Sequence, residues 1–301
     1  MKKVLLSIIA TLMLLGCNNK TATTPLVNTT YDVEFDVDYN NCGTDPLVSK
    51  GGVDFGNESS VKAGRVASKK GYINISKIEA DIDLSALAQR SDFTGDWLNA
   101  AFYAVSSNVQ PIKGAYCDAE YSAVPFCQEI DFLETNGQKM FQHTLHLADA
   151  KSGPQRWEVS YTEAANVDCW EWDEMMADTD SGIHNLVDKI DPNKPFHMVV
   201  DFNEDYTNMI ITLSQDLNSV KVFDMIEGAV AGSSTLDMGM LKDAMAVGWW
   251  FTPSYHNSWS PGVDNPKWYK DSGGDCSHAT LCGAGGGWKL SNLKVTAEKE
   301  I

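Results

Sequence analysis

Apolar and polar residues alternate along much of the chain, and the alternation predicts β-strands. Residues 31–39 (YDVEFDVDY) and 71–84 (GYINISKIEADIDL) place apolar side chains at every second position, with acidic or polar residues between them. Because successive side chains of a strand point to opposite faces of a sheet, this pattern is typical of a strand with one buried and one solvated face. Residues 97–105 (WLNAAFYAV) are largely apolar, which indicates a buried strand.

Further strand-like segments follow at residues 139–147 and 208–223. We expect 139–147 (KMFQHTLHL) to be the antiparallel neighbour of the strand that ends at residue 134, and 208–223 to form strand, turn and strand. Helical periodicity is scarce, and hydrophobic residues make up 43% of the chain. The pattern predicts an all-β sandwich in one domain, residues 31–301, since no second linker or repeat interrupts it.

The N-terminal segment has the character of an export signal. A basic start at residues 1–3 precedes an apolar run, residues 4–15, that is too short to span a membrane as a mature helix. Residues 14–17 (LLGC) resemble a bacterial lipobox, in which cleavage before the cysteine leaves it as the lipid-bearing N-terminus. We therefore expect a signal peptide over 1–16, lipidation at Cys17, a polar tether over 17–30 and a location in the bacterial cell envelope. An ordinary secretory signal is the alternative.

Two details refine the expected location and partners. Asn18 follows the cysteine, and in Gram-negative lipoproteins this is compatible with the outer membrane. The formal net charge of −18 argues against nucleic acid or acidic membrane surfaces as partners, and mildly disfavours sulfated or uronic polysaccharides. We expect a monomer whose contact with the membrane is its N-terminal lipid.

Residues 127–134 (CQEIDFLE) place three carboxylates on a strand-like run. Glu129 and Asp131 share one face of a regular strand, whereas Glu134 lies an odd number of residues from both and would face the core. The adjacent apolar residues Phe132 and Leu133 are typical of a one-residue β-bulge, which re-aims a strand. With the bulge, all three acids face one cleft. A solvated acidic edge strand is the alternative.

Two carboxyl groups so placed would lie roughly 5 Å apart, the separation that suits a retaining glycosidase. Repulsion between close carboxylates favours one that stays ionised and another that holds a proton. The acids alone therefore point to hydrolysis of a glycosidic bond. This chemistry requires neither a metal nor an organic cofactor.

The segment 129–134 (EIDFLE) resembles the bulged active-site signature of glycoside hydrolase family 16 and of the related family 7 cellulases, both built on a concanavalin A-like β-jelly roll of two antiparallel sheets. The resemblance implies that Glu129 is the nucleophile, Glu134 the acid/base and Asp131 an electrostatic helper. Residues 116–118 (YCD) are similar to a family 7 segment that a disulfide ties to the cysteine just upstream of the nucleophile, here Cys127. Glu120 stands where family 7 has glutamine.

Residues 190–202 also look like the long strand of family 7, and residues 287–295 resemble the closing strand of both families. The resemblance further implies sugar-binding residues. Trp250 and Trp259 have the nine-residue spacing of two sugar-stacking tryptophans in family 7, although taken alone each is better explained as a buried core residue. Residues 144–146 (TLH) resemble a Thr-x-His motif of family 16, while His143 lies on the opposite face of its strand; a structural histidine is the alternative. The substrate-binding residues expected are Trp97, Tyr116, His146, Trp250 and Trp259.

Six cysteines remain besides Cys17, an even number in an exported chain, where disulfides are permitted. Six cysteines allow 15 pairings. Proximity in sequence favours Cys117 with Cys127 and Cys276 with Cys282, which leaves Cys42 with Cys169. Metal binding is the competing interpretation, although no Cys-x-x-Cys pair and no companion histidine at ligand spacing supports it.

Taken together, the sequence predicts a retaining, endo-acting glycoside hydrolase of a neutral β-glucan, with β-1,4 or mixed β-1,3/1,4 linkages. The chain is far shorter than a typical family 7 enzyme, which indicates an open cleft. Two alternatives use the same fold. One is a non-catalytic polysaccharide-binding lipoprotein of the cell surface, although binding alone needs no carboxylate pair at bulge spacing. The other is a polysaccharide lyase, which would need a tyrosine or histidine base and a basic cleft.

Overall fold

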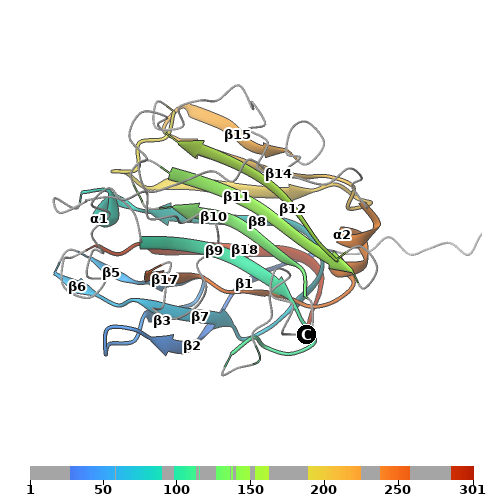
Figure 1. Ribbon diagram of the computed structural model, residues 1–301, viewed down its shortest axis with the longest axis horizontal. Helices are drawn as coiled ribbons and strands as arrows, with labels where there is room; N and C mark the ends of the chain where they lie inside the picture. Colours follow the sequence, from blue (N-terminus) through green and yellow to red (C-terminus); the bar gives the residue numbers. More distant parts are fainter. Residues whose placement is uncertain are drawn as a thin grey trace, which may run out of the picture.

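The computed structural model describes residues 28–57, 59–89, 98–112, 115, 127–135, 137, 140–149, 153–162, 189–224, 238–257 and 286–301. Antiparallel strands dominate this part of the chain, and most belong to one 16-stranded hydrogen-bonded sheet. The sheet folds over itself, so that its strands form two layers that overlap in the view of Figure 1. The all-β sandwich predicted from the alternating pattern is confirmed.

The first layer carries the acidic strand at its centre. Its order across the sheet is β2 (Phe35–Asn40), β7 (Gly64–Ser68), β17 (Ser254–Asn257), β9 (Leu98–Ser106), β10 (Glu129–Thr135), β11 (Met140–Asp149) and β12 (Gly153–Thr162). Figure 1 shows β9, β10 and β11 running side by side. The antiparallel pairing of 139–147 with the acidic strand, expected from the sequence, is confirmed.

The second layer forms the back of the sandwich. Its order is β15 (Asn218–Asp224), β14 (Met209–Gln215), β13 (Phe196–Phe202), β8 (Tyr72–Asp83) and β18 (Lys289–Glu300). At its edge, β18 also pairs with β1 (Thr29–Asp32) and β4 (Gly52–Asp54), and β4 pairs with β3 (Leu47–Ser49). A short strand, β16 (Trp249–Phe251), joins the layers because it pairs with both β8 and β9.

A few short elements complete the described part of the chain. β5 (Gly56–Asn57) and β6 (Ser60–Val61) form a separate two-stranded sheet. The described helices are α1 (Ser85–Ala88) and α2 (Met238–Met245). Within the described residues, neither helix has the length and apolar character needed to cross a membrane.

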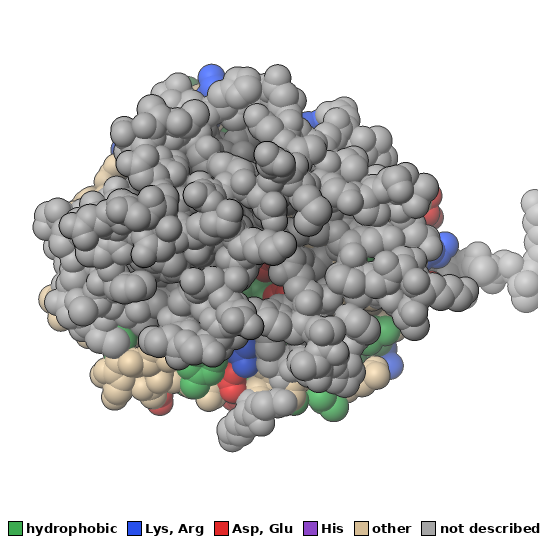
Figure 2. Space-filling view, viewed as in Figure 1, with side chains coloured by type: hydrophobic (Ala, Val, Ile, Leu, Met, Phe, Trp, Pro, Cys, Tyr) green, Lys and Arg blue, Asp and Glu red, His purple; other side chains and the backbone are tan. Residues whose placement is uncertain are grey.

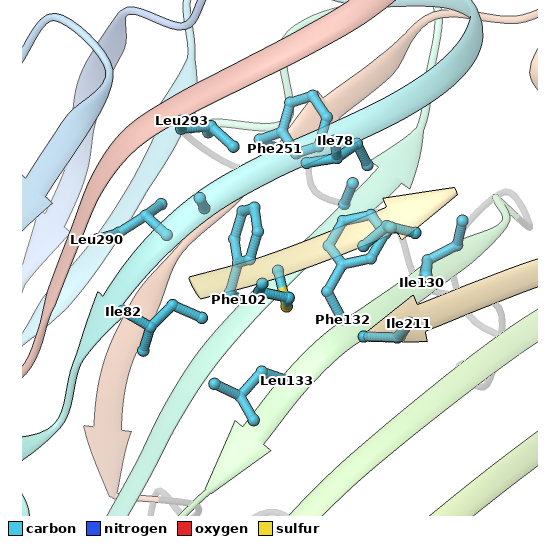
Figure 3. Close-up of a cluster of buried hydrophobic side chains, with 14 of the residues drawn as sticks. Ile78, Ile82, Phe102, Ile130, Phe132, Leu133, Ile211, Phe251, Leu290 and Leu293 are labelled. Carbon is cyan, nitrogen blue, oxygen red and sulfur yellow. The ribbon is translucent and has the colours of Figure 1, made fainter. Parts of the chain in front are cut away.

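The hydrophobic core lies between the two layers (Figure 3). Phe102 and Phe132 of the first layer have ring centroids 5.1 Å apart, and in Figure 3 they face the region of Ile78 and Ile82, which come from β8 of the second layer. All four side chains are almost fully buried. Each contributes on the order of 1.5–3 kcal/mol through burial, so the core side of the first layer is fixed by packing.

Two predicted strands are shorter or more broken than the pattern indicates. Residues 31–39 form two strands, not one, because β1 pairs with β18 of the second layer and β2 pairs with β7 of the first. Val33, in the break, remains completely buried, so the alternation continues although the pairing changes. The segment 190–202 becomes a strand only at Phe196; Pro195 precedes it, and Lys194 N donates to Asp191 O in a turn.

Candidate active site

A one-residue β-bulge interrupts β10, as predicted from the sequence. Toward β9, Asp131 is paired with Tyr103 and Leu133 with Phe102, so two steps along β10 match one step along β9. Toward β11 the register shifts in the same place. Phe132 has no cross-strand partner in either ladder. Beyond the bulge, the extra residue therefore exchanges the faces of the sheet to which successive β10 side chains point.

The bulge brings the three acids to one face of the sheet. Directly opposite residues of neighbouring antiparallel strands share a face. Across β9, Glu129, Asp131 and Glu134 stand opposite Val105, Tyr103 and Ala101, in that order. These three β9 residues form a small buried cluster with Cys127, separate from the main core. The acids thus lie on the side of the first layer that faces away from the core.

This face is only partly open to solvent. Glu129 is 5% exposed and Asp131 is 6% exposed, while Glu134 is half-buried. Acidic side chains are visible near the centre of the face shown in Figure 2. Carboxylates are seldom this buried unless they are hydrogen-bonded or functional.

Asn99 of β9 holds the third acid. Its Nδ2 donates a hydrogen bond to Glu134 Oε1 with a donor–acceptor distance of 2.6 Å. Asn99 is 5% exposed and lies two residues before Ala101, so it belongs to the same face. Asn99 was not among the predicted site residues; an asparagine within an apolar strand was the available signal.

A buried ion pair lies farther along this face, on β7 and β2. The Arg65 guanidinium contacts Asp38 Oδ2 through Nε at 2.8 Å and through Nη2 at 2.5 Å. Its carbon Cζ lies 5.3 Å from the centre of the Tyr39 ring, within cation–π range. In register, Arg65 is opposite Ser254, which is itself opposite Ala101 of β9. This ion pair was not predicted from the sequence, although the single arginine in the segment GRVAS (residues 64–68) was a signal.

Tyr103 connects the ion pair to the acids. It is the cross-strand partner of Asp131, and its hydroxyl interacts with the Arg65 guanidinium. Burial raises the pKa of Tyr103 well above its usual value, against the lowering effect of Arg65, so the phenol stays protonated. The described face therefore combines three carboxylates, a phenol, an amide and a neutralised guanidinium.

The two histidines of β11 occupy different positions. His143 is completely buried on the core side, and its Nδ1 lies 2.6 Å from Phe132 O. Burial lowers the pKa of His143 to about 4, more than the hydrogen bond to Phe132 raises it. His146 lies directly opposite Glu129 in the ladder. His146, not His143, therefore has the register of the acid-bearing face.

Trp250 lies on the same side of the sheet as the acids, because it pairs with Val105. It is 7% exposed, and its indole Nε1 donates to Ser107 O at 2.9 Å. The ring also lies against Gly71, where a Cβ atom would come within 2.9 Å of it. Only a small part of the ring is accessible, and its role in sugar stacking stays a prediction. Trp97, Tyr116 and Trp259 lie outside the described residues.

The cysteine predictions can be followed at two positions. Cys42 and Cys127 are each disulfide-bonded. Cys117, Cys169, Cys276 and Cys282, as well as the lipidation candidate Cys17, lie outside the described residues, so the pairings remain predictions. In the described ranges, no group of three or more histidine, cysteine, aspartate or glutamate residues is arranged to hold a metal ion.

Comparisons with known proteins find similarity at the level of structure. No family model matches the chain, and no curated protein matches its sequence. The endo-1,3-β-glucanase from Streptomyces sioyaensis is 11% identical, with a TM-score of 0.46 over 88% of this chain and 90% of its own. A glycoside hydrolase family 16 endo-glucanase from Bacteroides ovatus is 13% identical, with a TM-score of 0.41 over 92% and 96% of the two chains. A laminarinase from Flavobacterium sp. UMI-01 is 13% identical, with a TM-score of 0.40 over 84% and 82%.

Proposed function

We propose that this protein is a retaining, endo-acting glycoside hydrolase of a neutral β-glucan. The observation that carries the proposal is the bulge in β10, which brings Glu129, Asp131 and Glu134 to one face. A bulge that re-aims a strand beside an active site is a recurrent feature of proteins. An acidic strand serving only solubility would have no need of buried carboxylates held by neighbouring side chains.

The proposed reaction is a double displacement. The Glu129 carboxylate attacks the anomeric carbon while the Glu134 carboxylic acid transfers its proton to the departing glycosidic oxygen. A glycosyl–Glu129 ester and a free chain end result. Glu134, now ionised, removes a proton from water, which attacks the same carbon and releases Glu129. Both inversions together retain the anomeric configuration.

The surrounding residues suit this division of roles. Asn99 donates to Glu134 Oε1, which holds the carboxyl group in position for proton transfer. Asp131 lies between the two glutamates in sequence and is opposite Tyr103. It would act on them through its charge, without forming a bond to the sugar.

The charges of the described face favour a neutral substrate over an anionic one. Arg65 is neutralised by Asp38 in a pair whose side chains are 11% and 4% exposed. A lyase acting on uronates requires positive charge to neutralise the carboxyl group of the sugar. The pairing of Arg65 and the net charge of −18 therefore support a β-glucan hydrolase.

One substrate screen tests the proposal. The purified protein is incubated with cellulose, mixed-linkage glucan, laminarin, xyloglucan and agarose, and new reducing ends are measured beside a Glu129→Gln control. We expect hydrolysis of at least one glucan, internal cleavage seen as a rapid fall in viscosity, and the β-anomer as the first product by NMR. An α-anomer would contradict retention. Tight binding without new reducing ends would favour the polysaccharide-binding protein.

A further inference from the structure

His143 stands directly opposite the bulge of β10. On β11 it lies between Thr144, the partner of Asp131, and Gln142, the partner of Glu134. The two β10 residues that face this single position are Phe132 and Leu133. In a bulge, two residues of one strand share one residue of its neighbour, and here that shared residue is His143.

The His143 side chain bonds to the bulge itself. Its Nδ1 is 2.6 Å from the carbonyl oxygen of Phe132, the residue that the register skips in both ladders. A carbonyl oxygen only accepts hydrogen bonds, so Nδ1 must carry the proton. Burial keeps the ring neutral above about pH 4, since it lowers the pKa of His143 to about 4. The bulge carbonyl thus receives a fixed donor from the core side.

We propose that His143 is a positioning residue for the catalytic acids. It holds the Phe132 carbonyl in the bulged conformation, and this conformation places Glu134 on the face of Glu129 and Asp131. The structural part of the proposal concerns the bulge alone, whereas its catalytic part rests on the proposed glycoside hydrolase function. His143 lies on the opposite side of the sheet from the acids, so it acts through the β10 backbone and has no contact with substrate.

The hydrogen bond between His143 and Phe132 matters because β10 could also form a regular strand without a bulge. In a regular pleat without the bulge, Glu134 would turn toward the core. The alternative is unfavourable because it buries a carboxylate among apolar side chains. Yet without the His143 donor, the bulge would also lose a hydrogen bond to a buried carbonyl oxygen. We therefore expect that, without the donor, the position of Glu134 relative to Glu129 and Asp131 is less well fixed.

Two substitutions separate positioning from packing. Asn at position 143 keeps a donor near the place of Nδ1, whereas Leu keeps much of the apolar volume without a donor. We expect His143→Leu to lower kcat at least tenfold with KM within about twofold of wild type. His143→Asn should retain most of kcat. His197→Leu is the matched control, because this half-exposed histidine of β13 contacts Asp81 in the other layer.

A second readout does not depend on turnover. In protein carrying ¹³C at the glutamate carboxyl groups, His143→Leu should shift the titrations of Glu129 and Glu134, and His143→Asn should shift them less. If wild type hydrolyses no glucan, the proposed function fails, and these titrations still decide the structural role of His143. Identical titrations in wild type and a folded Leu variant would overturn it.

The tautomer of His143 supplies a test in the unaltered protein. In ¹⁵N NMR spectra of wild type near pH 7, we expect a neutral ring with its proton on Nδ1. This measurement stands even if the Leu variant fails to fold. A ring protonated on Nε2 alone could not donate to Phe132 O, and that result would refute the proposal.

Discussion

Asn99 Nδ2 and Glu134 Oε1 are joined by a hydrogen bond of 2.6 Å that crosses from β9 to β10. The bond holds Glu134, which the bulge places on the face of the sheet that points away from the core. Among the described residues, the other amide atom, Asn99 Oδ1, is buried and has no hydrogen-bond partner. Asn99 is therefore oriented by Glu134, and replacing Asn99 should change the environment of that carboxyl group.

Replacing Asn99 should move the pH dependence of the reaction. Asn99→Asp places a second carboxyl group beside Glu134, and like charges disfavour ionisation. Because the proposed acid must be protonated, the alkaline limb of the kcat/KM profile should move to higher pH. Asn99→Ala removes the donor without adding charge and should move the limb less. An alkaline limb that stays in place in Asn99→Asp would show that Glu134 is not the group that limits activity at high pH.

The two glutamates should respond differently to amidation. Glu129→Gln should abolish turnover of all substrates, because no covalent intermediate forms. Glu134→Gln should spare the first step for an aryl glycoside with a good leaving group, which needs little protonation. Natural glucan hydrolysis should then fall by several orders of magnitude. Added azide should restore turnover of the aryl substrate, because this anionic nucleophile needs no general base to attack the glycosyl–Glu129 ester, and it releases Glu129 with a glycosyl azide as product.

Asp131→Asn tests in the same assays whether Asp131 acts through its charge alone, without forming a bond to the sugar. It should give a partial loss of kcat and a shifted pH optimum, since it changes the charge beside both glutamates. Steady-state kinetics and product NMR measure all three variants. Near-normal activity of Glu129→Gln, or azide rescue of that variant in place of Glu134→Gln, would contradict the assignment.

The ion pair on β7 and β2 should contribute strongly to stability. Asp38→Ala leaves the Arg65 guanidinium buried without its carboxylate, and breaking a buried pair in this way typically costs about 3–5 kcal/mol. The pair of Lys69 and Glu34 is the control, with side chains 46% and 56% exposed. Glu34→Ala should cost less than about 1 kcal/mol. Urea denaturation at pH 7 measures both free energies of unfolding, and equal losses would contradict the prediction.

The expected lipidation of Cys17 leads to a prediction about the location of the protein. If Cys17 is the acylated residue, labelled fatty acid should be incorporated into the protein, and the protein should fractionate with membranes. Multiple acyl chains on one residue anchor a protein stably. Cys17→Ala should lose both the label and the membrane association. Unchanged labelling in the variant would exclude lipidation at this position.

The sequence was most informative where local pattern and tertiary structure agree. The alternation in 71–84 became β8, and the adjacent apolar residues Phe132 and Leu133 marked the bulge. Both signals arise within one strand, from the two-residue period of the pleat. The candidate acids could be found for the same reason, since Glu129 and Glu134 belong to a single short segment.

Features that depend on pairing between distant strands were not predictable in this way. Arg65 reaches the acid-bearing face because β7 and β9 both pair with β17, which lies far later in the chain. Asn99 lies within a run that reads as a buried strand, and only the bulge of another strand gives it Glu134 as a partner. The break after Asp32 likewise reflects a change from one layer of the sheet to the other, which leaves the alternation intact.

Burial of His143 should make the fold sensitive to acid in a defined range. The pKa of His143 is lowered to about 4 in the folded protein, whereas an unperturbed histidine has a pKa near 6.5. Between these values the unfolded chain binds a proton that the folded protein does not, so the free energy of unfolding decreases as pH falls. The contribution lost between about pH 6.5 and pH 4 is about 3 kcal/mol.

Urea denaturation across this pH range measures the effect. The free energy of unfolding should decrease less steeply with falling pH in His143→Asn, whose side chain does not titrate, than in wild type or in His197→Leu. Parallel curves for wild type and His143→Asn would mean that other groups cause the acid sensitivity and that His143 titrates alike in the folded and unfolded chain.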